Sequence, residues 1–146
     1  LRGLVSFDFL IDSETPYLLE VNPRAVASLD VLDDAAGTLF KAHVAACEGG
    51  DAAGLLAAQW QPRPRAMAYV YADRGHVIAP AAPWPDWCTD LPQPGTAIAQ
   101  YTPAITVHAT ASTLAQAISN LTDRLGQLEA MLYGSKKNMS PEGNSP

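Results

Sequence analysis

The chain has 146 residues, with 9 Lys plus Arg against 15 Asp plus Glu, a formal net charge of -6 and 48% hydrophobic residues. This length suits one ordinary domain or two very small ones, and the apolar content is enough for a core. The acidic balance and scattered arginines argue against the basic surface that nucleic acid requires. The sequence contains no apolar run of about 18 residues and no secretory leader, so we expect a cytoplasmic protein that binds no membrane.

Two further features bound the kind of protein. Cys47 and Cys88 are far apart and form no CxxC pattern, so we expect reduced thiols and neither a disulfide framework nor a zinc site. Residue 1 is Leu and the chain opens directly into strand-like sequence. We therefore expect a piece of a longer protein.

The first half of the chain predicts a β-hairpin followed by a helix. Residues 4–11 and 17–22 are rich in β-branched, aromatic and aliphatic residues, and a polar turn separates them. From Ser28, apolar residues recur every three or four positions, which is typical of an amphipathic helix. Ser28 is suited to its N-cap, Gly37 is expected to kink or split it, and Gly49 with Gly50 is expected to end it.

After a Gln-, Pro- and Arg-containing linker at 59–64, the composition indicates a second module. In chain order we expect a hairpin formed by 66–72 and 76–79, a Pro-rich loop over 80–95, strands over 96–101 and 105–110, and a helix capped by Ser112 that ends at Gly134. The fold class is therefore α+β: an antiparallel hairpin plus helix in residues 1–58, then a small antiparallel β module with a C-terminal helix in residues 63–134. Residues 135–146 are expected to form a disordered tail.

The predicted hairpin brings carboxylates together. With the turn centred on Glu14, opposite pairs are expected at Ser6 and Asn22, Phe7 and Val21, Asp8 and Glu20, and Phe9 and Leu19. Two facing carboxylates destabilise a sheet unless one is protonated or a cation lies between them. Acid, acid and amide oxygens are the hard ligands that Mg²⁺ prefers, and Arg24 could pair with a phosphoryl group or a carboxylate. The pattern predicts a nucleotide-phosphate site.

The alternative is that the acids lie on a solvated face, which is the usual outcome for a polar hairpin face. Here Asp8 stands within Phe7-Asp8-Phe9-Leu10 and Glu20 within Leu18-Leu19-Glu20-Val21. We therefore expect both faces of the hairpin to be largely covered.

Residues 3–10 and the segment Leu19-Glu20-Val21-Asn22-Pro23-Arg24 resemble the last strands of the ATP-grasp fold. The resemblance implies that 1–58 is the end of an ATP-grasp catalytic lobe. It also implies that Asp8, Glu20 and Asn22 hold the Mg²⁺ ions of ATP, with Mn²⁺ as an alternative ion, and that Arg24 contacts the substrate carboxylate or acyl phosphate. The nucleotide-clamping lobe of that family has no counterpart here, so half of the ATP pocket is expected to come from an upstream ATP-grasp lobe.

The intact enzyme that this resemblance implies is an ATP-dependent ligase that joins small-molecule carboxylate and amine substrates through an acyl phosphate. Alone, the chain is expected to be inactive. Later segments are similar to a carboligase-related ATP-grasp subgroup, some members of which accompany tetrahydromethanopterin-linked one-carbon metabolism. A homodimer is left open. The competing hypothesis is a non-catalytic protein-interaction module with a degenerate ATP-grasp hairpin.

Other candidate residues are better explained by packing. His43 and Cys47 lie four positions apart on the predicted helix, but no third metal ligand is evident. Trp84 and Trp87 are expected to anchor the Pro-rich loop and not to stack on a ligand. No Gly-rich phosphate loop is present.

Overall fold

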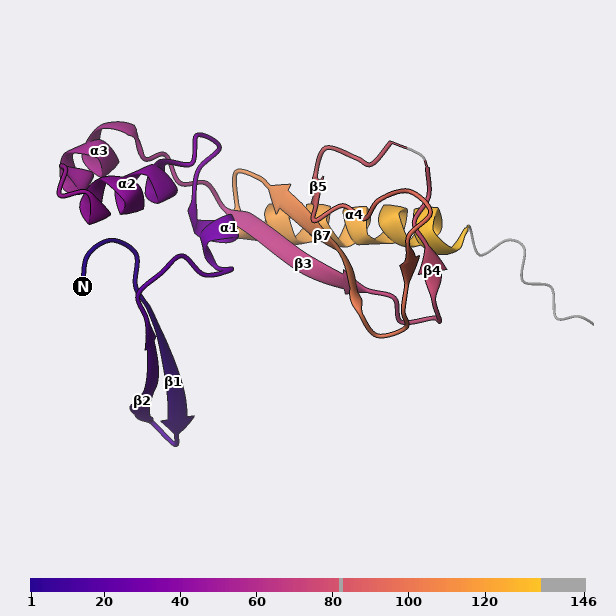
Figure 1. Ribbon diagram of the computed structural model, residues 1–146, viewed down its shortest axis with the longest axis horizontal. Coiled ribbons are helices and arrows are strands. Elements are labelled where there is room, and N and C mark those ends of the chain that lie inside the picture. Colours follow the sequence, from indigo (N-terminus) through magenta and orange to yellow (C-terminus); the bar gives the residue numbers. More distant parts are fainter. Residues whose placement is uncertain (82, 135–146) are drawn as a thin grey trace, which may run out of the picture. The chain divides into compact units, whose positions relative to one another are not determined.

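A computed structural model describes residues 1–81 and 83–134 (Figure 1). The chain divides into an N-terminal unit, Leu1–Arg63, and a C-terminal unit that starts at Pro64. The division falls at the end of the predicted Gln-, Pro- and Arg-containing linker. Antiparallel sheets and a long final helix give the α+β fold that the sequence predicts. The expected disordered tail lies outside the described residues.

The N-terminal unit begins with a hairpin of β1 (Ser6–Asp12) and β2 (Thr15–Asn22). Its two turn residues are Ser13 and Glu14, and Ser13 has a positive φ of 58°. The register shifts between Asp8 and Phe9, so that Phe9 lies opposite Leu18. The predicted pairing of Phe9 with Leu19 is therefore wrong, because a bulge adds one residue to β2 at that point.

The predicted single helix is split, as the position of Gly37 suggested. It forms α1 (Leu29–Leu32) and α2 (Thr38–Cys47), and Gly37 caps α2 with a left-handed φ of 69°. Ser28 occupies the N-cap of α1 without a side-chain hydrogen bond. Instead the Asp33 carboxylate, between the two helices, accepts hydrogen bonds from the amides of Leu39 and Phe40 at 2.8 and 3.1 Å. A carboxylate here satisfies amides that the helix cannot pair internally.

Asp34 connects the start of α2 to Gln61, near the end of the N-terminal unit. Its carboxylate accepts hydrogen bonds from the amides of Ala36, Thr38 and Gln61 at 3.0 to 3.1 Å. Removal from water would by itself raise the pKa of Asp34, but hydrogen bonds from Thr38, Gln61 and Ala36 outweigh it and lower the pKa to about 2. Gln61 follows α3 (Ala52–Gln59), a helix that the sequence analysis did not anticipate and that Asp51 caps through the amide of Gly54.

The C-terminal unit contains a three-stranded antiparallel sheet in the order β3-β7-β5. These strands are β3 (Arg65–Tyr71), β7 (Pro103–Thr110) and β5 (Cys88–Thr89), and β4 (Val77–Ile78) pairs separately with β6 (Ala97–Ile98). The predicted hairpin between 66–72 and 76–79 is therefore wrong. The first strand pairs with β7, more than thirty residues away, and the second pairs with β6.

The long helix α4 (Leu114–Tyr133) packs against β3 and β7 (Figure 1). Its N-cap is Thr113, whose hydroxyl accepts the Gln116 amide, so the predicted cap at Ser112 is wrong by one residue. The core joins buried residues of the helix and sheets, and Trp84 and Trp87 pack against it as expected. Its buried members are Ala72, Val77, Ala79, Cys88, Ile98, Ala104, Ile105, Val107 and Leu128.

Candidate functional site

The hairpin places the two predicted acids directly opposite each other. Asp8 on β1 pairs with Glu20 on β2, and Ser6 pairs with Asn22. Directly opposite residues of an antiparallel pair have Cβ atoms about 4.5 to 5.5 Å apart. The predicted juxtaposition of Asp8 with Glu20 therefore occurs in the structure, although the turn and the bulge around it differ from the prediction.

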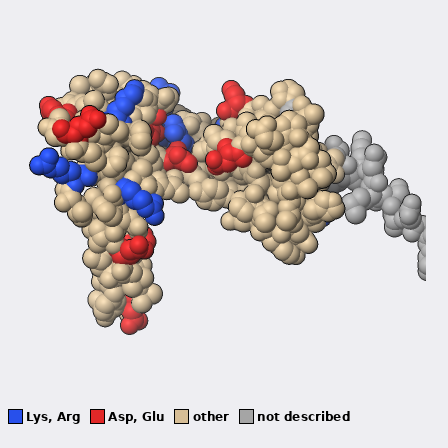
Figure 2. Space-filling view, in the orientation of Figure 1, with Lys and Arg blue, Asp and Glu red and all other residues tan. Residues whose placement is uncertain are grey.

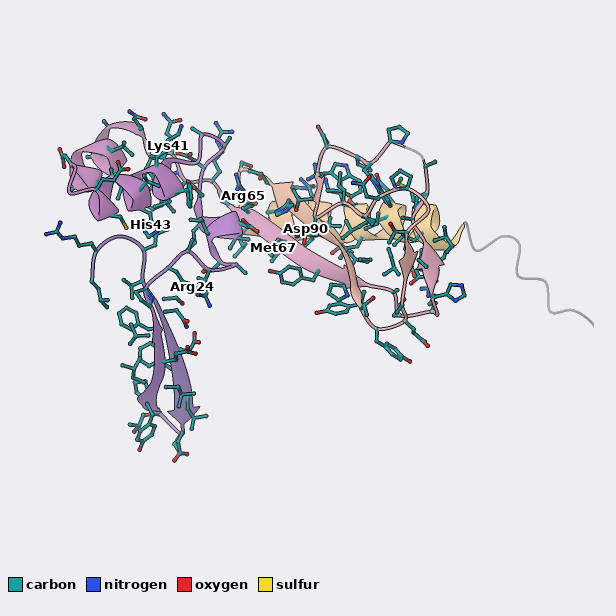
Figure 3. All side chains as sticks on the ribbon, in the orientation of Figure 1. Arg24, Lys41, His43, Arg65, Met67 and Asp90 are labelled. Carbon is teal, nitrogen blue, oxygen red and sulfur yellow. The ribbon has the colours of Figure 1, made fainter. Side chains whose placement is uncertain are left out.

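Asn22 and Arg24 continue the site at the base of the hairpin, where Figure 3 labels Arg24. Asn22 Nδ2 donates to Asp8 Oδ2 at 3.3 Å, and Arg24 Nη2 donates to Asn22 Oδ1 at 3.4 Å. The amide of Arg24 also donates to the carbonyl of Asn22 at 2.9 Å, which closes a tight turn around Pro23. Three of the four predicted side chains thus form one polar chain, Asp8 to Asn22 to Arg24, and Glu20 lies opposite Asp8 outside this chain.

The orientation of the Asn22 amide matters for cation binding. Its nitrogen faces Asp8 and its oxygen faces Arg24. A cation held jointly by Asp8 and Asn22 would require the opposite orientation, because only the amide oxygen is a ligand. Arg24 Nη2 would then lose its hydrogen bond to Oδ1 and be available for a phosphoryl or carboxylate oxygen, while Nη1 donates to the carbonyl of Ala25 at 3.2 Å.

The acids are exposed, and the expectation that both hairpin faces are covered is wrong for this chain. Phe7 and Phe9 are 51% and 53% exposed, and Ile11 is 70% exposed. Further apolar hairpin side chains at least one-third exposed are Leu10, Tyr17, Leu18, Leu19 and Val21. In the described part of the N-terminal unit, the only buried residues are Thr38 and Ala42. The hairpin strands carry the apolar side chains from which coverage was predicted, but no described residue of the N-terminal unit buries them.

The charge of the hairpin is entirely negative. Residues 6–22 contain four acids and neither Lys nor Arg, and Figure 2 shows acidic side chains along an otherwise uncharged hairpin. The described residues contain no cluster of three or more His, Cys, Asp or Glu side chains suited to a metal. The carboxylates of Asp8 and Glu20 and the amide of Asn22 are the predicted oxygen ligands that the paired strands bring together here. This set fits Mg²⁺ that keeps most of its positions for water and phosphate oxygens.

A small cavity lies beside Arg24, and the sequence analysis missed it. Its volume is about 110 Å³, and it is lined by Leu4, Val5, Ser6, Arg24, Ala25, Val26, Ser28, Leu29, Leu32 and Leu39. The polar residues in this lining are Arg24, Ser6 and Ser28. Only the fold brings the segment after β2 over the start of β1, so no sequence signal marks this cavity. Its size suits a small group next to a cation.

His43 makes the packing contact that the sequence favours, and Cys47 lies beside it as an exposed thiol. The amide of Leu4 donates to His43 Nδ1 at 3.0 Å, and Cys47 Sγ lies 3.9 Å from the same nitrogen. Gly3 has a φ of 82°, and a Cβ there would lie 2.3 Å from His43 Nδ1. The ring therefore joins the segment before β1 to α2, and only glycine permits this close approach.

Comparisons with protein-family models, with curated proteins and with solved structures found no match. Across residues 1–81 and 83–134, none of the helices combines the length and the apolar content that crossing a membrane requires.

Proposed function

We propose that this chain is the C-terminal part of a cytoplasmic ATP-dependent ligase that joins a carboxylate to an amine or a related nucleophile. The observation that carries the proposal is the pairing of Asp8 with Glu20 on a hairpin that has no basic residue. Facing carboxylates repel each other, and a divalent cation removes this repulsion. ATP with Mg²⁺, or with Mn²⁺, is the cofactor that such a site would hold.

The residues of this chain would position and neutralise charge and would make no covalent bond. Mg²⁺, when bound, would offset the charge of the ATP phosphates. Asp8, Glu20 and Asn22 would hold it through oxygen atoms. The substrate carboxylate oxygen would attack the γ-phosphorus and release ADP. The amine would then attack the acyl carbon, with loss of inorganic phosphate and of one amine proton.

Arg24 would bind the anionic acyl phosphate. Arg24 is one of the residues that line the cavity of about 110 Å³, and its guanidinium donates to Asn22 Oδ1 and to the carbonyl of Ala25. A planar guanidinium can pair with two oxygens of a phosphate or a carboxylate. Arg24 would therefore discriminate in favour of acid substrates, and the cavity would limit the size of the group beside it.

An upstream ATP-grasp lobe is the partner that this proposal requires. A two-stranded hairpin is marginal by itself, and this one exposes apolar side chains such as Phe7, Ile11 and Leu19. Covering these side chains with a second lobe would exclude water from the acids and complete the nucleotide pocket. Tetrahydromethanopterin-linked one-carbon metabolism is the candidate context.

A second candidate is a non-catalytic interaction module. The exposure of the acids and of the apolar hairpin side chains also fits a protein-binding surface. This alternative predicts that substitutions of the exposed apolar hairpin residues weaken partner binding, whereas substitutions of the carboxylates do not.

The test is Glu20→Ala in the ligase that contains this chain, with Glu14→Ala in the turn as a matched control. We expect Glu20→Ala to abolish ATP-dependent phosphate release without changing the circular dichroism spectrum. Glu14→Ala should retain activity, because Glu14 lies in the turn and opposes no carboxylate. Near-normal turnover of Glu20→Ala would refute the proposal and favour the interaction module.

A further inference from the structure

The C-terminal unit has a groove along one edge of its sheet. In the described residues β3 pairs only with β7, so its other edge is unpaired. A hollow of about 520 Å³ lies between this strand and α4. It is lined by residues of β3 that point toward the helix and by those that point away, together with one face of α4: Ala68, Tyr69, Val70, Tyr71, Asp73, Thr122, Leu125, Gly126, Glu129, Leu132 and Tyr133. Because both sets of β3 residues line it, the hollow opens onto the strand edge.

The hydrogen-bond pattern shows which backbone groups face this edge. Met67 lies opposite His108 and Tyr69 lies opposite Thr106. The amide of His108 donates to the carbonyl of Trp87 at 3.0 Å, which directs it away from β3. Met67 and His108 are therefore a pair without mutual hydrogen bonds, and so are Tyr69 and Thr106 two residues further along. The N–H and C=O of Met67 and Tyr69 point away from β7, toward the unpaired edge. These groups can pair with one further strand.

A second hollow, of about 360 Å³, lies on the sheet face opposite the helix. It is lined by Tyr69, Tyr71, Asp90, Pro103, Ala104, Ile105 and Thr106, and Figure 3 labels Asp90 and Met67. The two tyrosines are 48% and 49% exposed. Thr106, which is 1% exposed, donates its hydroxyl to Asp90 Oδ2 at 2.5 Å and so fixes this carboxylate over β7. No described residue forms a hydrogen bond with the other oxygen of Asp90.

The charges at both hollows favour a basic occupant. Their lining includes the carboxylates of Asp73, Glu129 and Asp90 but neither Lys nor Arg. Glu129 is paired with Arg74 and Asp73 accepts the Tyr133 hydroxyl, whereas within residues 1–81 and 83–134 the side chain of Asp90 accepts a hydrogen bond only from Thr106. A strand added beside β3 would lie two strand spacings, about 9.5 Å, from β7, over which the Asp90 carboxylate is held. A Lys or Arg side chain that passes over the tyrosine rings is long enough to reach this carboxylate.

From these observations we propose that β3 and α4 form a binding site for an extended basic peptide, which adds to the sheet as a fourth strand beside β3. Outward groups of Met67 and Tyr69 supply main-chain hydrogen bonds. Alternate apolar side chains of the peptide enter the groove over α4. The intervening Lys or Arg side chains lie across Tyr69 and Tyr71 toward Asp90.

The experiment measures fluorescence anisotropy of a labelled octapeptide in which Lys and Arg alternate with Val and Leu, added to the whole chain. Matched peptides carry Glu in place of the basic residues, or Pro at alternate positions. Met67→Pro removes one outward N–H and no hydrogen bond to β7, and Met67→Leu is its control. Asp90→Asn removes the charge, and Asp86→Asn, a change in the same unit outside both hollows, is its control.

We expect the basic peptide to bind at least about tenfold more tightly than either matched peptide. Met67→Pro should weaken binding at least about tenfold and Asp90→Asn about fivefold, with both controls unchanged. Equal binding of the acidic peptide, or undiminished binding to Met67→Pro, would overturn the proposal. A wild-type dimer that Met67→Pro dissociates would also overturn it, because a second copy would then occupy the edge. If Met67→Pro does not fold, Asp90→Asn decides, and unchanged affinity refutes the site.

Discussion

Replacing Asp8 with Asn should change hairpin stability in opposite directions with and without a divalent cation. Asp8 and Glu20 are opposite each other and exposed. Two unit charges about 6 Å apart in a water-like dielectric repel by about 0.7 kcal/mol. Without metal, Asp8→Asn should therefore stabilise the hairpin, and its amides should exchange with deuterium about threefold more slowly.

With Mg²⁺ the wild-type hairpin should become more stable than that of Asp8→Asn. At a concentration about ten times its Kd, a ligand that binds only the native state stabilises it by about 1.4 kcal/mol. Wild-type hairpin amides should then be protected about elevenfold more than in EDTA, whereas those of Asp8→Asn should not respond. The assay is hydrogen exchange of residues 6–22 by mass spectrometry, and Asp12→Asn is the control because Asp12 lies opposite Thr15. Equal Mg²⁺ responses of the wild type and Asp8→Asn would refute this reasoning.

Three further predictions concern the two units separately. Hydrogen bonds lower the folded pKa of Asp34 to about 2, below the unfolded value near 3.9, so the stability that ionised Asp34 contributes is present above about pH 4 and lost as the pH falls toward 2. In Asp34→Ala the urea midpoint of unfolding should therefore depend less on pH over this range. A pH dependence equal to that of the wild type would contradict this prediction. Leu128 is 0% exposed, so Leu128→Ala should lower the free energy of unfolding, measured with urea, by about 2 to 5 kcal/mol. Ile118 is 51% exposed, so Ile118→Ala should lower it by less than about 0.5 kcal/mol. Equal losses would contradict the burial of Leu128 in the core. Burial chiefly raises the pKa of Cys88 to about 11 while Cys47 is exposed, so a thiol reagent at pH 8 should modify only Cys47 in the folded protein; rapid reaction of both would contradict this.

The sequence was sufficient to pair Asp8 with Glu20 because two departures from the predicted hairpin cancel. The turn is centred between Ser13 and Glu14 and not on Glu14, which shifts the register by one residue near the turn. The bulge between Phe9 and Asp8 restores it. Alternation of apolar and acidic residues therefore found the right pairs near the open end but not near the turn.

Long-range contacts account for most of the remaining differences. Neighbouring strand-like segments favour a hairpin by local rules, but 66–72 pairs with β7, where Val107 and Ile105 bury against α4. Single-sequence patterns do not contain such pairing, because it depends on which apolar faces meet in the core. The α3 helix was missed for a related reason: all its residues before Gln59 are apolar, so it lacks the periodicity that identifies an amphipathic helix.

The central claim is that the acids of the hairpin hold a divalent cation, and paramagnetic broadening of backbone amide signals by Mn²⁺ tests it most directly. Titrating Mn²⁺ into the chain should broaden the amides of residues 6–8 and 20–24 first, and Glu20→Gln should abolish this local broadening. Excess Mg²⁺ should restore the wild-type signals by competition. Broadening spread evenly over exposed acids such as Asp86 and Asp123, or unchanged in Glu20→Gln, would contradict the claim.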